Sequence, residues 1–378
     1  MKNFKKTLCG LLFGLAGFGA VAATVSDVKA RQRYPWNGKI DIDYTITGTD
    51  TTNTALAVTL TDNDTGNVYS FTEGGRHQFT WNKTDLVVSN VTATVSLVSY
   101  NIPTVAKELY CVIDLLGGPD ATRWPVSYLA TVPIGGWTDD YKTTKLVLRR
   151  IEVGTFIMGD DQTDESHRVT LTKPFYMGVF EVTQRQFELI MGPWPNPFYT
   201  TWGLGETYPA YCVSYDDIRG PSLGAQWPAS STVDALSFLG KLRTKTGLDF
   251  DLPTEAQWEY ACRAGMATTY YWGDSMDGTY VWYEDNSDNK THPVGTKEPN
   301  AWGLYDMSGN MAEVCRDRYG IPVYGTDPVG SASGSNRVCR GGGWGHYADR
   351  CTSSFRYGTE PFSYPGNSGF RLVVLLSD

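Results

Sequence analysis

The chain has 378 residues, of which 41% are hydrophobic and only 19% charged, and its formal net charge is −9. This length corresponds to two domains or three, and the hydrophobic content excludes a disordered chain. Because nucleic acid is bound through clustered lysines and arginines, the acidic balance and the lack of basic runs exclude a nucleic-acid partner. The 40 glycines, 12 tryptophans and 23 tyrosines indicate a loop-rich fold with much aromatic packing.

The N-terminal segment is typical of a signal peptide that covers residues 1–23. Three lysines precede an apolar, glycine-rich stretch, and alanines just before Thr24 offer a cleavage site. The apolar stretch is shorter than the roughly 20 residues that a membrane-spanning helix needs. We therefore expect an exported protein, secreted, periplasmic or at the cell surface, with no membrane span after cleavage. The alternative is an uncleaved membrane tether.

Residues 24–105 are predicted to form a small all-β, sandwich-like domain. Short segments of strand-forming residues are separated by polar turns, and no helical periodicity interrupts them. No set of residues suited to catalysis is present, which favours a spacer or adhesion module. The expected strands cover residues 39–46, 55–60, 68–71, 78–81 and 91–98.

Residues 106–144 are transitional between two domains. Strand-like segments at 112–115 and 126–129 are separated by a turn that contains two glycines and a proline. They either complete the first domain or pack onto the second, which is assigned to residues 145–378.

The second domain is predicted to start with two strands, 145–151 and 155–159, and to contain three helices. Two helices begin with capping boxes, at Thr183 and Thr254, because each threonine is followed three residues later by a glutamine. The helix between them, at 232–245, should end at a glycine and bury three leucines. These residues are Gly247, Leu236, Leu239 and Leu242.

Six cysteines follow the signal peptide, and in an exported protein they permit three disulfides. None belongs to a C-x-x-C motif, and the four histidines lack the spacing of a zinc site. We expect structural or free thiols, with disulfides as the alternative, at Cys111, Cys212, Cys262, Cys315, Cys339 and Cys351.

Five motifs in the second domain resemble, in the same order, those of the formylglycine-generating enzyme or sulfatase-modifying factor family. The resemblance runs from about residue 145 to residue 376 and implies that family's α+β, C-type-lectin-like fold. The motifs are TFIMG at 155–159, LPTEAQWEYA at 252–261, NAWGLYDMSGN at 300–310, RGGGW at 340–344 and GFRL at 369–372.

The residues for catalysis in that family are incomplete. In the catalytic branch, two cysteines five positions apart hold copper and activate oxygen, because paired thiolates stabilise soft Cu(I). Cys351 matches the second position, whereas His346 stands at the first, and Gly343 replaces a serine of the family motif. Ala312 and Val314 replace an aromatic pair. Two interpretations remain: a copper site made by His346 and Cys351, or Cys351 as a buried core thiol.

A structural calcium site is also implied by the resemblance. The catalytic branch carries calcium near a Gly-Asn-x-x-Glu segment, and this chain retains Asn310 and Glu313, while Asn286 lies near a second such place. Amide, carboxylate and backbone oxygens are the ligands that Ca²⁺ prefers. The alternative is that these asparagine side chains fix loop backbone.

A binding surface is predicted in the C-terminal loops. Of the 30 residues from 341 to 370, 14 are glycine or aromatic, a composition that resembles antibody paratopes. Some members of the family fold carry C-terminal regions diversified by a retroelement, with the same layout ending in Gly-Phe-Arg. The candidate contact residues are Trp344, Tyr347, Asp349, Phe355, Tyr357 and Tyr364, with ordinary aromatic packing as the alternative.

Two functions from different classes follow. The first is a non-catalytic module that binds an extracellular or periplasmic ligand or protein. The second is a formylglycine-generating oxidoreductase that acts on a cysteine of exported proteins, and only this function requires copper. We favour the binding module, because the copper-binding pair is incomplete.

Overall fold

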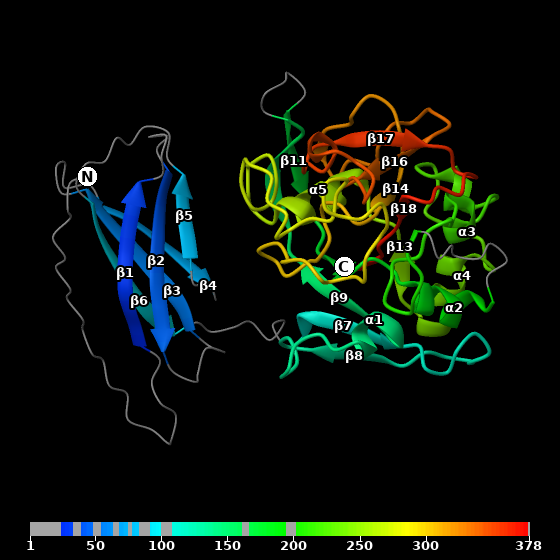
Figure 1. Cartoon of the computed structure of the whole chain (residues 1–378), viewed down its shortest axis with the longest axis horizontal. Helices are drawn as coiled ribbons and strands as arrows, with labels where there is room; N and C mark the ends of the chain where they lie inside the picture. Colours follow the sequence, from blue (N-terminus) through cyan, green and yellow to red (C-terminus); the bar gives the residue numbers. More distant parts are fainter. Residues whose placement is uncertain are drawn as a thin grey trace. The chain divides into compact units, whose positions relative to one another are not determined.

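The structure is a computed structural model that describes residues 24–32, 39–47, 54–62, 68–74, 78–82, 91–99, 108–160, 166–193 and 202–376. The predicted signal peptide lies outside these residues. The chain divides into two units, Met1–Thr104 and Val105–Asp378 (Figure 1). Within the described residues, no helix has the length and apolar character needed to cross a membrane.

The N-terminal unit consists of two three-stranded antiparallel sheets, which confirms the all-β prediction. One sheet has the order β1–β2–β5, and the other has the order β4–β3–β6. All five expected strands are present, whereas β1 is not among the predicted ones. The bounds are β1 (Thr24–Gln32), β2 (Lys39–Thr47), β3 (Thr54–Asp62), β4 (Val68–Gly74), β5 (Gln78–Asn82) and β6 (Val91–Ser99).

A six-stranded antiparallel sheet forms the base of the C-terminal unit, in the order β13–β19–β12–β9–β7–β8. The transitional segment supplies β7 and β8, and β7 pairs with β9, so both strands belong to this sheet. The bounds are β7 (Tyr110–Asp114), β8 (Val126–Leu129), β9 (Lys145–Ile151), β12 (Phe175–Gly178), β13 (Asp249–Asp251) and β19 (Val373–Leu375).

Two smaller sheets complete the strands of this unit. The four-stranded sheet β17–β16–β14–β18 carries the C-terminal loops and lies away from β7 and β8 in Figure 1. The third sheet has the order β10–β11–β15. The bounds are β10 (Gly154–Met158), β11 (His167–Leu171), β14 (Ala312–Arg318), β15 (Gly325–Thr326), β16 (Arg337–Arg340), β17 (Arg356–Thr359) and β18 (Ser368–Gly369).

The helices confirm both predicted capping boxes. Thr183 caps α2 and Thr254 caps α5, and each exchanges hydrogen bonds with the glutamine three residues later. A third box, at Ser214, caps α3 and was not predicted. Helices α2, α3 and α4 are grouped on one side of the unit (Figure 1). The bounds are α1 (Asp140–Thr143), α2 (Gln184–Met191), α3 (Tyr215–Arg219), α4 (Phe238–Thr246) and α5 (Glu255–Arg263), with single 3₁₀ turns η3 (Gly224–Gln226) and η4 (Ala348–Arg350).

The predicted helix at 232–245 is corrected at its start. The Ser237 hydroxyl accepts a hydrogen bond from the backbone N–H of Gly240, so α4 begins only after Ser237. Leu236 therefore lies outside the helix and is 82% exposed, whereas Leu239 and Leu242 are buried as predicted. Gly247 ends the helix in the left-handed conformation, as expected.

Aromatic side chains join the helices to the sheets. The rings of Phe187 in α2 and Phe238 in α4 stack at 5.3 Å, and Phe370 of the GFRL motif meets Phe238 edge-on at 5.2 Å. All six cysteines of the C-terminal unit are buried and unpaired, which confirms the expectation of free thiols. The core therefore depends on packing without disulfides among the described residues.

Candidate functional site

The C-terminal loops begin where β16 ends, in a run of three glycines. Gly341 and Gly342 have positive φ angles of 84° and 68°, which glycine adopts without strain. A Cβ at Gly342 would lie 2.5 Å from the Arg350 carbonyl oxygen and 2.9 Å from the Cys351 Sγ. At Gly343 it would lie 2.8 Å from the Asn367 carbonyl oxygen, so the serine of the family motif has no room here.

The His346 ring is fixed as a neutral imidazole. The backbone N–H of Gly343 donates to its Nδ1 at 2.9 Å, which places the ring proton on Nε2. Burial, with Arg350 nearby, lowers the pKa of His346, although Asp349 opposes this effect. The ring packs edge-on against Tyr357, at 5.7 Å between centroids. The Nδ1 lone pair of His346 is therefore already occupied by a backbone hydrogen bond.

Cys351 lies in an apolar pocket of its own. It is fully buried and belongs to a cluster with Tyr270 and Val281. Burial, with a smaller contribution from Asp349, raises the pKa of this thiol to about 12. At neutral pH the sulfur is thus protonated, and a metal ion would have to displace this proton to bind it.

His346 and Cys351 have different packing partners in this structure. The described contacts of His346 are with Gly343, Phe355 and Tyr357, and those of Cys351 involve none of these residues. Within the described part of the chain, no group of three or more His, Cys, Asp or Glu residues is arranged to hold a metal. The geometry supports the interpretation of Cys351 as a core thiol.

The residues proposed for calcium already bind protein groups. The Asn310 amide donates to Glu181 at 2.7 Å, and its oxygen accepts from the Thr291 hydroxyl and the His292 N–H. Asn286 bonds the backbone at both ends of its amide, to Tyr283 and Val281. In this structure both asparagine side chains therefore bond loop backbone.

Glu313, the third proposed calcium ligand, belongs to a buried charge cluster. Its carboxylate accepts hydrogen bonds from the Trp258 indole and the Arg371 guanidinium, both at 2.6 Å. Asp306 lies in the same cluster, and burial raises its pKa to about 6. Glu181 is also buried there, and burial together with the charge of Asp306 raises its pKa well above the usual value. Glu181 was not among the predicted residues, because nothing local in the sequence marks it, whereas Asp306 belongs to the NAWGLYDMSGN motif.

The predicted contact residues divide into exposed and packed ones. Tyr347 and Tyr364 are 61% and 49% exposed, and Asp349 is also exposed. The remaining three are half-buried: the Trp344 indole donates to the Gly366 carbonyl, Tyr357 shares a hydrogen bond with Ser368, and Phe355 packs beside Tyr357. Phe362, 63% exposed, belongs to the same loops and is missing from the predicted set.

The fold described above is that of a known protein family. Residues 139–376 match the sulfatase-modifying factor enzyme 1-like domain, and the chain belongs to that family. The formylglycine-generating enzyme of Thermomonospora curvata is 32% identical over 275 residues, which cover 58% of this chain and 91% of that enzyme. The one from Streptomyces coelicolor is 35% identical over 141 residues, which cover 32% of this chain but only 45% of that enzyme.

Solved structures with the same fold confirm the predicted architecture of the C-terminal unit. Treponema denticola variable protein 1 is 26% identical, with a TM-score of 0.52, and the match covers 62% of this chain and 96% of that protein. PvdO from Pseudomonas aeruginosa is 25% identical, with a TM-score of 0.50, over 61% of this chain and 94% of that protein.

Proposed function

We propose that the C-terminal unit is a non-catalytic module that binds an extracellular or periplasmic ligand or protein through its C-terminal loops. Two observations support this proposal: the Nδ1 of His346 accepts a backbone hydrogen bond, and Cys351 is a fully buried thiol whose pKa is raised. The likeness to a variable protein supports the same choice.

The contact surface would be made by the exposed aromatic side chains of these loops. Tyr347, Phe362 and Tyr364 expose large rings that have few rotatable bonds, so immobilising them on binding loses little entropy. The positions with exposed side chains are also those at which sequence changes would disturb packing least. Tolerance of sequence changes at these positions is compatible with a C-terminal segment diversified by a retroelement. A near-identical, adenine-substituted copy of the segment beside the gene would support the proposal that it is diversified.

Panning of a random peptide display library tests the surface. We expect the wild-type protein to enrich peptides that the triple variant Tyr347→Ser, Phe362→Ser, Tyr364→Ser no longer retains. Leu116→Ser is the control, because Leu116 is also a largely exposed apolar side chain but lies outside these loops. Enrichment that survives in the triple variant, or no enrichment at all, would count against this surface.

Copper loading tests the alternative. Formylglycine formation remains the competing function because several relatives, among them the two described above, are named formylglycine-generating enzyme. We expect no stoichiometric binding of Cu(I) and no aldehyde when a cysteine-containing peptide is supplied with oxygen. Stoichiometric Cu(I) binding that disappears in Cys351→Ala, together with aldehyde product, would replace the binding module with the enzyme.

Export is proposed on the sequence alone. Fractionation of the producing cells, followed by N-terminal sequencing, should find a mature chain that begins at Thr24. A protein that keeps residues 1–23 in a membrane fraction would instead support the tether.

A further inference from the structure

A cleft of about 580 Å³ opens in the C-terminal unit at residues that the loop surface does not include. This volume lies within the roughly 300–1,000 Å³ typical of small-molecule sites. Several of its walls are apolar and come from β11, β19 and the segments next to them. The apolar lining residues are Leu171, Pro174, Leu248, Pro328, Val329, Val374, Leu375 and Leu376.

One wall carries a buried arginine with too few acceptors. Arg316, at 5% exposure, lines the cleft, and its guanidinium donates to Asp251 through Nη1 at 3.2 Å. Its Nε is buried and has no hydrogen-bond partner among the described residues. A guanidinium has five N–H groups, and leaving a buried one of them without an acceptor is unfavourable.

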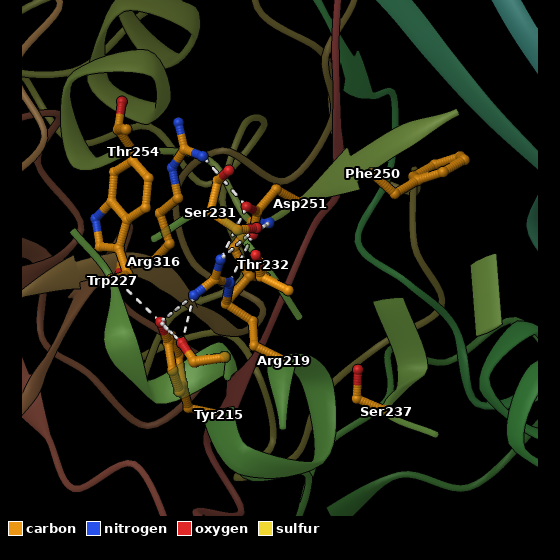
Figure 2. A network of polar contacts seen from close by, with 12 residues as sticks. Tyr215, Arg219, Trp227, Ser231, Thr232, Ser237, Phe250, Asp251, Thr254 and Arg316 are labelled. Carbon is orange, nitrogen blue, oxygen red and sulfur yellow. Dashed lines mark hydrogen bonds and ion pairs between the residues drawn. The ribbon is translucent and has the colours of Figure 1, made fainter. Parts of the chain in front are cut away.

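Asp251 cannot neutralise Arg316 alone, because two other arginines share it. Figure 2 shows Arg219 and Arg316 converging on its carboxylate, with the Trp227 indole beside Arg316. Arg219 binds both oxygens, at 2.8 and 3.1 Å, and Arg243 contacts one at 3.4 Å. The guanidinium of Arg316 stacks on Trp227 at 3.9 Å, which holds its plane in place.

Other carboxylates around the cleft limit the charge of a ligand. Asp249 is paired with Arg243 at 3.0 Å, and Asp327 accepts a hydrogen bond from the backbone N–H of Thr172. Asp317, next to Arg316 in the chain, accepts from the backbone N–H of Glu255. These negative charges would repel a dianion such as phosphate more strongly than a monoanion bound to Arg316.

We propose that this cleft binds a small monocarboxylate with an apolar body, its carboxylate on Arg316 and its apolar part against Leu248, Val374 and Leu375. Arginine and carboxylate form paired, charge-assisted hydrogen bonds, so a ligand that reaches Arg316 would supply the acceptors that Asp251 does not. The proposed ligand is therefore a branched-chain or aromatic carboxylic acid. This site is independent of the loop surface and of its proposed role.

Ligand-observed NMR on the full chain tests the proposal, with phenylacetate and 4-methylpentanoate as probes. We expect saturation transfer from the protein to both acids and at least tenfold weaker binding of phenylacetamide, which has the same shape but no charge. Inorganic phosphate should not compete. Equal binding of acid and amide, competition by phosphate, or no binding of either acid at millimolar concentration would overturn the proposal.

Two variants locate the binding. Arg316→Gln should weaken phenylacetate binding at least tenfold, but it also removes a partner of Asp251 and its folding must be checked by circular dichroism. Val329→Trp fills the cleft from an exposed position and leaves the side chains of the ion network unchanged. Ile321→Trp is its matched control, because Ile321 is exposed but does not line the cleft. Undiminished binding in Val329→Trp, or an equal loss in Ile321→Trp, would place the ligand elsewhere.

Discussion

The Arg371 guanidinium donates from Nε to the Glu313 carboxylate at 2.6 Å, and both side chains are completely buried. Glu313 follows the NAWGLYDMSGN motif and Arg371 belongs to GFRL, so this ion pair connects two of the motifs on which the family resemblance rests. Arg371 also donates to the backbone carbonyl of Gly178 in β12. Here these motifs stabilise the fold, and their presence does not by itself imply catalysis.

Breaking this pair should destabilise the protein strongly. Glu313→Gln or Arg371→Met leaves the other charge buried without its partner, and we expect a loss of about 3–5 kcal/mol in the free energy of unfolding. Urea denaturation measures it. The double variant should lose less than the sum of the two single variants, because it leaves neither charge unpaired. A loss below about 1 kcal/mol in either single variant would contradict the prediction.

The two leucines on either side of the start of α4 should differ in their contribution to stability. Leu239→Ala should lower the free energy of unfolding by about 2–5 kcal/mol, because Leu239 is fully buried. Leu236→Ala removes the same atoms from an exposed side chain and should change the free energy of unfolding by less than about 0.5 kcal/mol. Equal losses would mean that Leu236 is buried like Leu239 and would contradict its assigned exposure.

Local signals in the sequence predict local structure well. The capping boxes at Thr183 and Thr254 were found because the two partners are three residues apart and their chemistry is specific. The start of α4 was missed because residues 232–236 also permit a helix, and only the cap at Ser237 decides between the two possibilities.

Features that depend on distant residues could not be predicted in this way. The buried carboxylates of Glu181 and Asp306 are balanced in part by Arg371, which is remote from both in sequence. The state of His346 depends on the backbone N–H of Gly343 meeting its Nδ1, a matter of loop conformation. The family motifs therefore indicate the fold, whereas burial and hydrogen bonding show what the site can do.

Asp306 should make the protein more stable as the pH falls from 7 to 5. Burial raises its folded pKa to about 6, above the unfolded value of 3.8, so the folded state binds the proton more tightly in this range. Ionised Asp306 therefore destabilises the fold above pH 6, and protonation relieves this between pH 6 and pH 4. The effect is on the order of 2 kcal/mol.

Asp306→Asn tests this dependence. Urea denaturation at pH 7, 6 and 5 should show a smaller gain on acidification in the variant than in the wild type, because the variant has no proton to bind there. Asp349→Asn is the control, since Asp349 is exposed and should leave the wild-type profile unchanged. The same profile in Asp306→Asn and wild type would contradict the assignment. His346 acts in the opposite direction, since burial lowers its pKa.

Removal of calcium tests whether the protein binds the predicted structural calcium ion. Because the Asn310 amide oxygen already accepts two hydrogen bonds, we expect the same melting temperature in calcium chloride and in EDTA. Asn310→Ala should nevertheless lose about 1–3 kcal/mol in the free energy of unfolding, since buried partners would be left unpaired. A rise of several degrees with calcium that is absent in Asn310→Ala would show that an ion is bound.

Thiol reactivity tests whether Cys351 is a core residue. Its pKa of about 12 and its complete burial predict that iodoacetamide at pH 8 leaves it unmodified in the folded protein, because the thiolate is the reactive form. Mass spectrometry of peptides labelled before and after unfolding in urea measures this. Cys262 is the internal control, since it is also buried and its pKa is likewise raised to about 12. Rapid labelling of Cys351 alone in the folded state would mean an accessible thiolate at this position, which would support the copper interpretation.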